Sequence, residues 1–85
     1  MEAGRPAERM TAGELQDLLV TALVRQAGGT KRDWRAALGP VRVYGAETHP
    51  HCNWSVSPSG SNGENAIIER LLDDVRGRYP LVSEA

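Results

Sequence analysis

The chain has little of several residue types, and each shortage excludes a class of protein. A single cysteine, Cys52, excludes an intramolecular disulfide. Ten lysine and arginine residues against eleven acidic ones give a net charge of -1, which provides no overall attraction to phosphate or to a membrane surface. No run at the N-terminus has the apolar core of a signal peptide or the length of a membrane span. We therefore expect a cytoplasmic protein that does not associate with a membrane.

The length limits the chain to one domain with a small core. A domain of 85 residues buries only about 60 to 65% of the surface that its unfolded chain exposes, which leaves little room for a large buried pocket. A partner can supply the burial that the single chain lacks. Self-association, or a protein partner, is therefore an expectation from size alone.

Two long helices are indicated by capping boxes followed by apolar residues at helical spacing. Thr11 with Glu14 predicts the start of the first helix, which glycine at position 28 ends. Ser61 with Glu64 predicts the start of the last helix, and Pro80 prevents its continuation. The apolar stripes are Leu15, Leu18, Leu19, Ala22 and Leu23 in the first helix and Ile67, Ile68, Leu71, Leu72, Val75 and Tyr79 in the last.

A short helix is predicted between these two. Thr30 and Asp33 repeat the capping pattern, and Trp34, Ala37 and Leu38 fit one face of a helix of about two turns. The dipeptide Gly39-Pro40 ends it, because proline cannot continue a helix.

A β-hairpin is predicted from two runs that alternate with period two, residues 41–44 and 52–57. Alternation assigns two faces to it. The residues predicted to face the core are Val41, Val43, Cys52, Trp54 and Val56, and those predicted to face water are Arg42, Tyr44, Asn53 and Ser55.

These elements predict an α+β fold in a single small domain, in the order helix, short helix, two-stranded antiparallel hairpin, helix, with the two long helices on one face of the hairpin. The domain is expected to span residues 11–82, with residues 1–10 and 83–85 as disordered tails. A lone hairpin offers unpaired backbone groups at its edges, so a second copy could extend it to four strands in a dimer.

Part of the sequence resembles a group of short bacterial proteins for which no activity is established. The likeness rests on Trp34-Arg35, residues 39–44, the run from Thr48 to Val56, and Pro58-Ser59-Gly60, and it extends from about Leu15 to Tyr79-Pro80. The resemblance implies the same domain boundaries and a bacterial, cytosolic origin. It implies no mechanism and no catalytic residue.

The densest group of chemically reactive side chains is His49, His51 and Cys52. Imidazole nitrogen and thiolate sulfur are ligands that zinc prefers, but a structural zinc site needs four, and the chain has no further cysteine or histidine. A metal site would need a carboxylate such as Glu47, water, or ligands from a second copy. The alternative is that Cys52 is a small buried apolar residue and that the histidines order the loop. A cysteine nucleophile with a histidine base is disfavoured, because neighbours on a strand point to opposite faces.

A basic segment offers a second alternative, nucleic-acid binding. Lys31, Arg32, Arg35 and Arg42 are interleaved with Trp34 and Tyr44, which could stack on bases. However, Trp34 also fits the core, and the net charge is unsuited to a strong phosphate binder.

Because no complete catalytic set is present, we expect a non-catalytic interaction or regulatory protein that needs no cofactor. Its predicted working surface is the polar side of the hairpin together with the loop from His49 to Asn53. The predicted binding residues are Arg42, Tyr44, His49, His51, Asn53 and Ser55.

Overall fold

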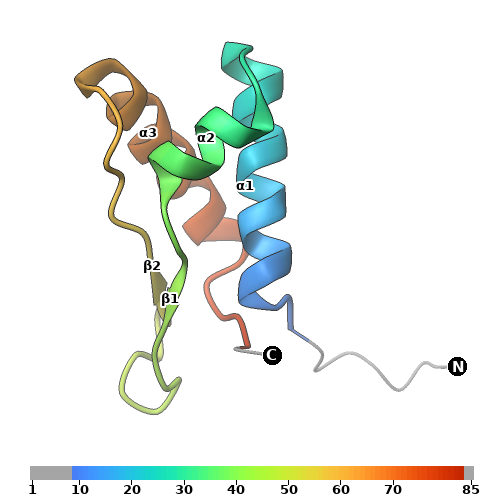
Figure 1. Ribbon diagram of the computed structural model, residues 1–85. Coiled ribbons are helices and arrows are strands. Elements are labelled where there is room, and N and C mark those ends of the chain that lie inside the picture. The colour runs from blue at the N-terminus through green and yellow to red at the C-terminus, as the bar shows by residue number, and fades with distance from the viewer. Residues whose placement is uncertain (1–8, 84–85) are drawn as a thin grey trace, which may run out of the picture.

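The computed structural model describes residues 9–83, which form a small α+β domain of three helices and a two-stranded antiparallel sheet (Figure 1). The predicted fold class is therefore confirmed. In chain order the elements are α1 (Ala12–Ala27), α2 (Lys31–Leu38), β1 (Arg42–Val43), β2 (Trp54–Ser55) and α3 (Asn62–Arg78). No helix in residues 9–83 combines the length and the apolar composition that crossing a membrane requires.

The predicted helix starts are confirmed by their caps. At α1 the Thr11 hydroxyl accepts the Glu14 N–H at 3.1 Å, while the Glu14 carboxylate accepts the Thr11 N–H at 2.9 Å. Ser61 and Glu64 form the same reciprocal pair at α3. These bonds satisfy N–H groups that have no partner inside the helix, which fixes where each helix begins.

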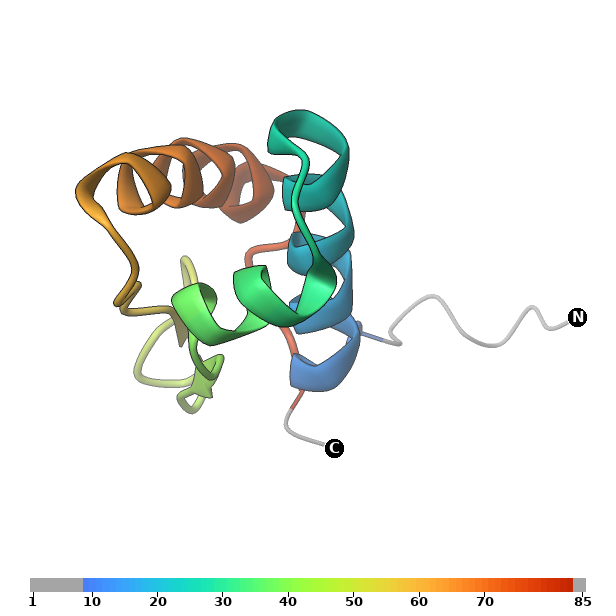
Figure 2. The ribbon, with the colours of Figure 1, turned by 45° about the horizontal axis from the view of Figure 1, so that its top comes forward.

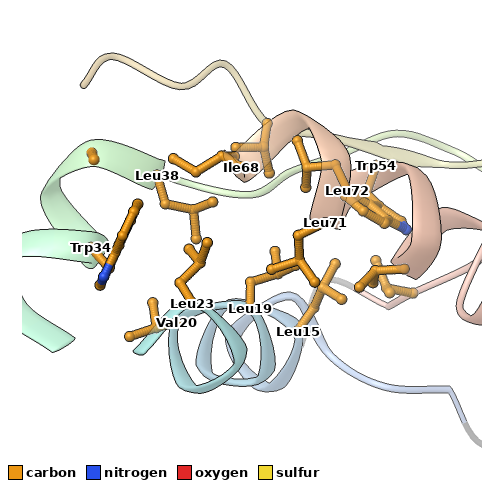
Figure 3. Packing of buried hydrophobic residues seen from close by; sticks show 14 residues of the cluster. Leu15, Leu19, Val20, Leu23, Trp34, Leu38, Trp54, Ile68, Leu71 and Leu72 are labelled. Atoms are coloured by element: carbon orange, nitrogen blue, oxygen red, sulfur yellow. The ribbon is translucent and has the colours of Figure 1, made fainter. Parts of the chain in front are cut away.

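The three helices enclose one apolar core, which Trp54 of the hairpin completes (Figures 2 and 3). Leu19 and Leu23 of α1 point toward Leu38 of α2 and toward α3. The fully buried side chains are Leu15, Leu19, Val20, Leu23, Leu38, Ile68, Leu72 and Val82. Two residues of the predicted α3 stripe were assigned wrongly, because Ile67 and Tyr79 are each 37% exposed.

The hairpin is shorter than predicted, with two paired residues in each strand. Arg42 lies opposite Ser55, and Val43 lies opposite Trp54. The predicted faces hold for these four residues, since Val43 and Trp54 are directed to the core while Arg42 is exposed and Ser55 half-buried.

The predicted exposure of Asn53 is wrong. Asn53 is only 3% exposed, and it is the one polar residue buried in the part of the chain that the structure describes. The segment that follows α3 covers it: the Asn53 side chain accepts the Val82 N–H and donates to the Val82 carbonyl, both at 2.8 Å. An asparagine amide carries the same donor and acceptor groups as a peptide bond, so it pairs with Val82 as a neighbouring strand would.

We call residues 79–82 the C-terminal strap. Besides Asn53, it is held by Trp54, whose indole N–H donates to the Tyr79 carbonyl at 2.8 Å. The Asn53 backbone N–H donates to the Pro80 carbonyl at 3.0 Å instead of to β1. The Asn53 carbonyl still accepts the Tyr44 N–H at 2.7 Å, but the reciprocal backbone bond is missing, so the regular ladder ends before this residue.

Two residues just outside the predicted domain boundaries, Met10 and Ser83, contact the rest of the domain. Met10 packs against the core, and its carbonyl accepts the Ser83 N–H at 2.9 Å. The Ser83 carbonyl in turn accepts the Ala12 N–H at 2.9 Å, so the two ends of the domain lie side by side. The rest of the predicted disordered tails, residues 1–8 and 84–85, lies outside the described residues.

Candidate interaction surface of the hairpin

Four of the six predicted binding residues lie next to one another on the hairpin. Arg42 is directly across the sheet from Ser55, and the hydroxyl groups of Ser55 and Tyr44 are 3.1 Å apart. The Tyr44 ring stacks on the imidazole of His49, with 4.5 Å between ring centroids and 22° between planes. We call Arg42, Tyr44, His49 and Ser55 the polar hairpin face.

The loop that carries His49 is held by one carbonyl group. The Gly45 carbonyl accepts the N–H of Thr48 at 3.2 Å, the N–H of His49 at 2.9 Å and the Thr48 hydroxyl at 3.0 Å. These bonds fold residues 45–49 into a turn at the end of the hairpin that lies away from the helices (Figure 1). The turn therefore fixes the His49 ring against the Tyr44 ring.

The same hydrogen bonds identify the tautomer of neutral His49. The Thr48 hydroxyl has one proton, and it donates that proton to the Gly45 carbonyl, which can only accept. The 2.9 Å contact between this hydroxyl and His49 Nδ1 must then have the imidazole as donor. His49 Nδ1 therefore carries the hydrogen, and Nε2 keeps its lone pair available for a donor on another molecule.

The remaining two predicted binding residues do not join this face. His51 is exposed in the loop, and no hydrogen bond of its side chain to residues 9–83 is present. Asn53 is buried under the C-terminal strap and cannot contact a partner. The only sequence signal for the strap is the apolar pair Leu81-Val82 after the helix-ending proline; Val82 is buried, whereas Leu81 is half-buried.

Cys52 lies on the side of the hairpin that faces the core. It is half-buried against the hydrophobic cluster, and its Sγ is 3.5 Å from the Trp54 carbonyl oxygen rather than beside an imidazole. Within residues 9–83, no group of three or more His, Cys, Asp or Glu side chains is arranged to hold a metal ion. Residues 9–83 of one chain thus offer no complete ligand set for the alternative metal site at His49, His51 and Cys52.

The basic residues are spread over three places. Lys31 and Arg32 lie in the first turn of α2, whereas Arg42 belongs to the hairpin beyond the other end of that helix (Figure 1). Arg35 binds Asp17 of α1 at 3.1 Å. Trp34 is only 6% exposed, and its indole N–H donates to the Gly28 carbonyl at 2.7 Å, so it is a core residue and not a stacking surface for bases.

The two edges of the sheet differ in accessibility. On the β2 side, Asn53 is 3% exposed and Trp54 is 2% exposed, so no further strand can reach their backbone. On the β1 side, the sheet formed by residues 9–83 has no third strand, and Figure 1 shows β1 in front of β2 with no other element drawn in front of it. The backbone groups of Arg42 and Tyr44 point toward β2, so those of Val43 point to the open edge.

Comparison of this chain with protein-family models, with curated proteins and with solved structures found no match.

Proposed function

We propose that this chain is a non-catalytic, cytoplasmic interaction or regulatory protein that binds another protein chain through the polar hairpin face and the adjoining open edge of β1. The observation that carries the proposal is that the two edges of the sheet differ in accessibility. The β2 edge is buried, and the β1 edge is open beside a fixed group of exposed polar and aromatic side chains. An open strand edge offers main-chain hydrogen bonds to a partner, and neighbouring side chains supply selectivity.

Two side chains of the polar hairpin face, Arg42 and Tyr44, suit binding. Arg42 is exposed and forms no ion pair with residues 9–83, so its guanidinium is available to a carboxylate or an aromatic ring. Tyr44 is 39% exposed and held between Ser55 and His49, which gives an aromatic contact surface with little rotamer freedom left to lose.

The contacts of the reactive side chains support a non-catalytic role. The Ser55 hydroxyl bonds to Tyr44, and the Cys52 thiol bonds to a backbone carbonyl, so neither nucleophile has a histidine base beside it. The His49 imidazole uses Nδ1 to bind Thr48 and stacks on the Tyr44 ring.

Site-specific photo-crosslinking in cells tests this function. A photoreactive amino acid replaces His51, which is exposed in the same loop as His49, and in a matched control it replaces Glu69, which is exposed on α3. We expect a discrete protein adduct from position 51 and none from position 69, whether the captured chain is another protein or a second copy. No adduct from position 51, or equal adducts from both positions, would contradict the proposal.

A further inference from the structure

We propose that the partner at the open edge of β1 is a second copy of this chain, and that the buried β2 edge limits the assembly to a closed dimer with a four-stranded sheet. This inference rests on the proposed function and specifies its partner.

The limit to two copies follows from the accessibility of the edges. A hairpin with two open edges could add copies at both sides and form an open-ended array. In this chain, Asn53 and Trp54 are both buried, and the C-terminal strap is bonded to them. Only β1 can pair with a further strand, and two identical edges that pair with each other form a two-fold symmetric contact that closes.

Backbone geometry restricts how two β1 strands can align. The backbone N–H and carbonyl groups that point to the open edge belong to Val43 and, two residues earlier, to Val41. Gly45 is the next residue of this series, but its carbonyl already accepts hydrogen bonds from Thr48 and His49. Two antiparallel copies can therefore be centred on Val43, Arg42 or Val41. Centring on Val41 places Val43 opposite Gly39, whose N–H and carbonyl are already bonded to Arg35 and Gln16, so this alignment is excluded. Centring on Arg42 places two guanidinium groups directly opposite each other, which is unfavourable.

Centring on Val43 gives a complementary contact instead. The two Val43 residues exchange their N–H and carbonyl groups, and Arg42 of each copy lies opposite Tyr44 of the other. A guanidinium beside an exposed tyrosine ring is a favourable cation–π pair, and it forms twice because of the symmetry. On the other face, Val41 and Val43 are half-buried, so a second copy would cover the apolar surface that they still expose.

Light scattering coupled to size-exclusion chromatography tests this dimer with the full chain. We expect the mass to rise with concentration from that of the 9.2 kDa monomer to twice that value and no further. Val43→Pro removes the outward N–H without touching a bond to β2, so this variant should stay monomeric with an unchanged circular dichroism spectrum. Val43→Ala is the matched control: it loses similar packing, keeps the N–H and should still dimerise.

A monomer at every concentration would overturn the inference. If position 51 nevertheless captures a different protein, the proposed function stands and only the identity of the partner is wrong. A mass that rises beyond that of a dimer would refute the claim that the β2 edge cannot pair. A Val43→Pro variant that dimerises like the wild type would refute pairing through β1.

Should Val43→Pro fail to fold, a mixture of two differently isotope-labelled wild-type populations replaces it. Isotope-filtered NMR should then show a contact between Val43 of one copy and Val43 of the other. Its absence in a sample whose mass is that of a dimer would contradict the proposed alignment.

Discussion

Asn53→Ala is expected to destabilise the domain far more than its position in a two-residue hairpin suggests. The Asn53 amide accepts the Val82 N–H at 2.8 Å and donates to the carbonyls of Val82 and Tyr44 at 2.8 and 3.0 Å. Alanine leaves these three backbone groups without that partner at a site that is 3% exposed. A buried polar group that loses its partner costs about 1 to 3 kcal/mol.

The three costs do not simply add, because the C-terminal strap can separate from the hairpin and admit water. We therefore expect a loss of about 2 to 4 kcal/mol in the free energy of unfolding, a large part of the roughly 5 to 15 kcal/mol typical of a domain. Urea denaturation followed by tryptophan fluorescence measures it, since Trp34 and Trp54 are both buried. Asn62→Ala, on the exposed first turn of α3, is the control and should stay within about 0.5 kcal/mol of wild type. An Asn53→Ala variant as stable as this control would refute the role assigned to the amide.

Three further predictions concern other parts of the chain. Ser61→Ala removes the hydroxyl that accepts the Glu64 N–H and should lower the free energy of unfolding by about 1 kcal/mol; an unchanged urea midpoint would contradict the capping argument. Thr48→Val removes the acceptor for His49 Nδ1–H. Nitrogen NMR of the neutral imidazole should find the Nδ1–H form dominant in wild type and a shift toward the Nε2–H form in the variant. An Nε2–H form in wild type would overturn the assignment. Cys52 should react with a thiol reagent more slowly in the native chain than in urea, and equal rates would support the thiol alternative. Protein purified without a tag should carry no stoichiometric metal, and one bound zinc for each dimer would support the metal alternative.

Local signals in the sequence were sufficient to predict where the helices begin. Thr11, Thr30 and Ser61 each cap the helix predicted for them, because a capping side chain bonds to a backbone group only two or three residues away. The short helix containing Trp34 was also predicted correctly, and its indole ring lies in the core. Such short-range contacts can be recognised from residue type and spacing alone.

The assignment of Asn53 failed because its partner is distant in the sequence. Alternation along residues 52–57 takes account only of neighbours within the strand, whereas Val82 lies 29 residues further on. The position of the C-terminal strap depends on where α3 ends and in which direction the chain leaves it, and neither is contained in a strand pattern. Alternation was sufficient to place Arg42, Tyr44 and Ser55 on one side of the hairpin, because these residues lie within or next to the paired residues.

The central claim is that the sheet has one closed edge and one open edge, and amide hydrogen exchange measured at several protein concentrations tests it most directly. The account predicts that the N–H groups of Tyr44, bonded to the Asn53 carbonyl, and of Val82, bonded to the Asn53 side chain, exchange slowly at every concentration. The Val43 N–H should exchange rapidly in dilute protein and slow down as the concentration rises. Rapid exchange at Val82, or slow exchange at Val43 in the most dilute sample, would contradict it.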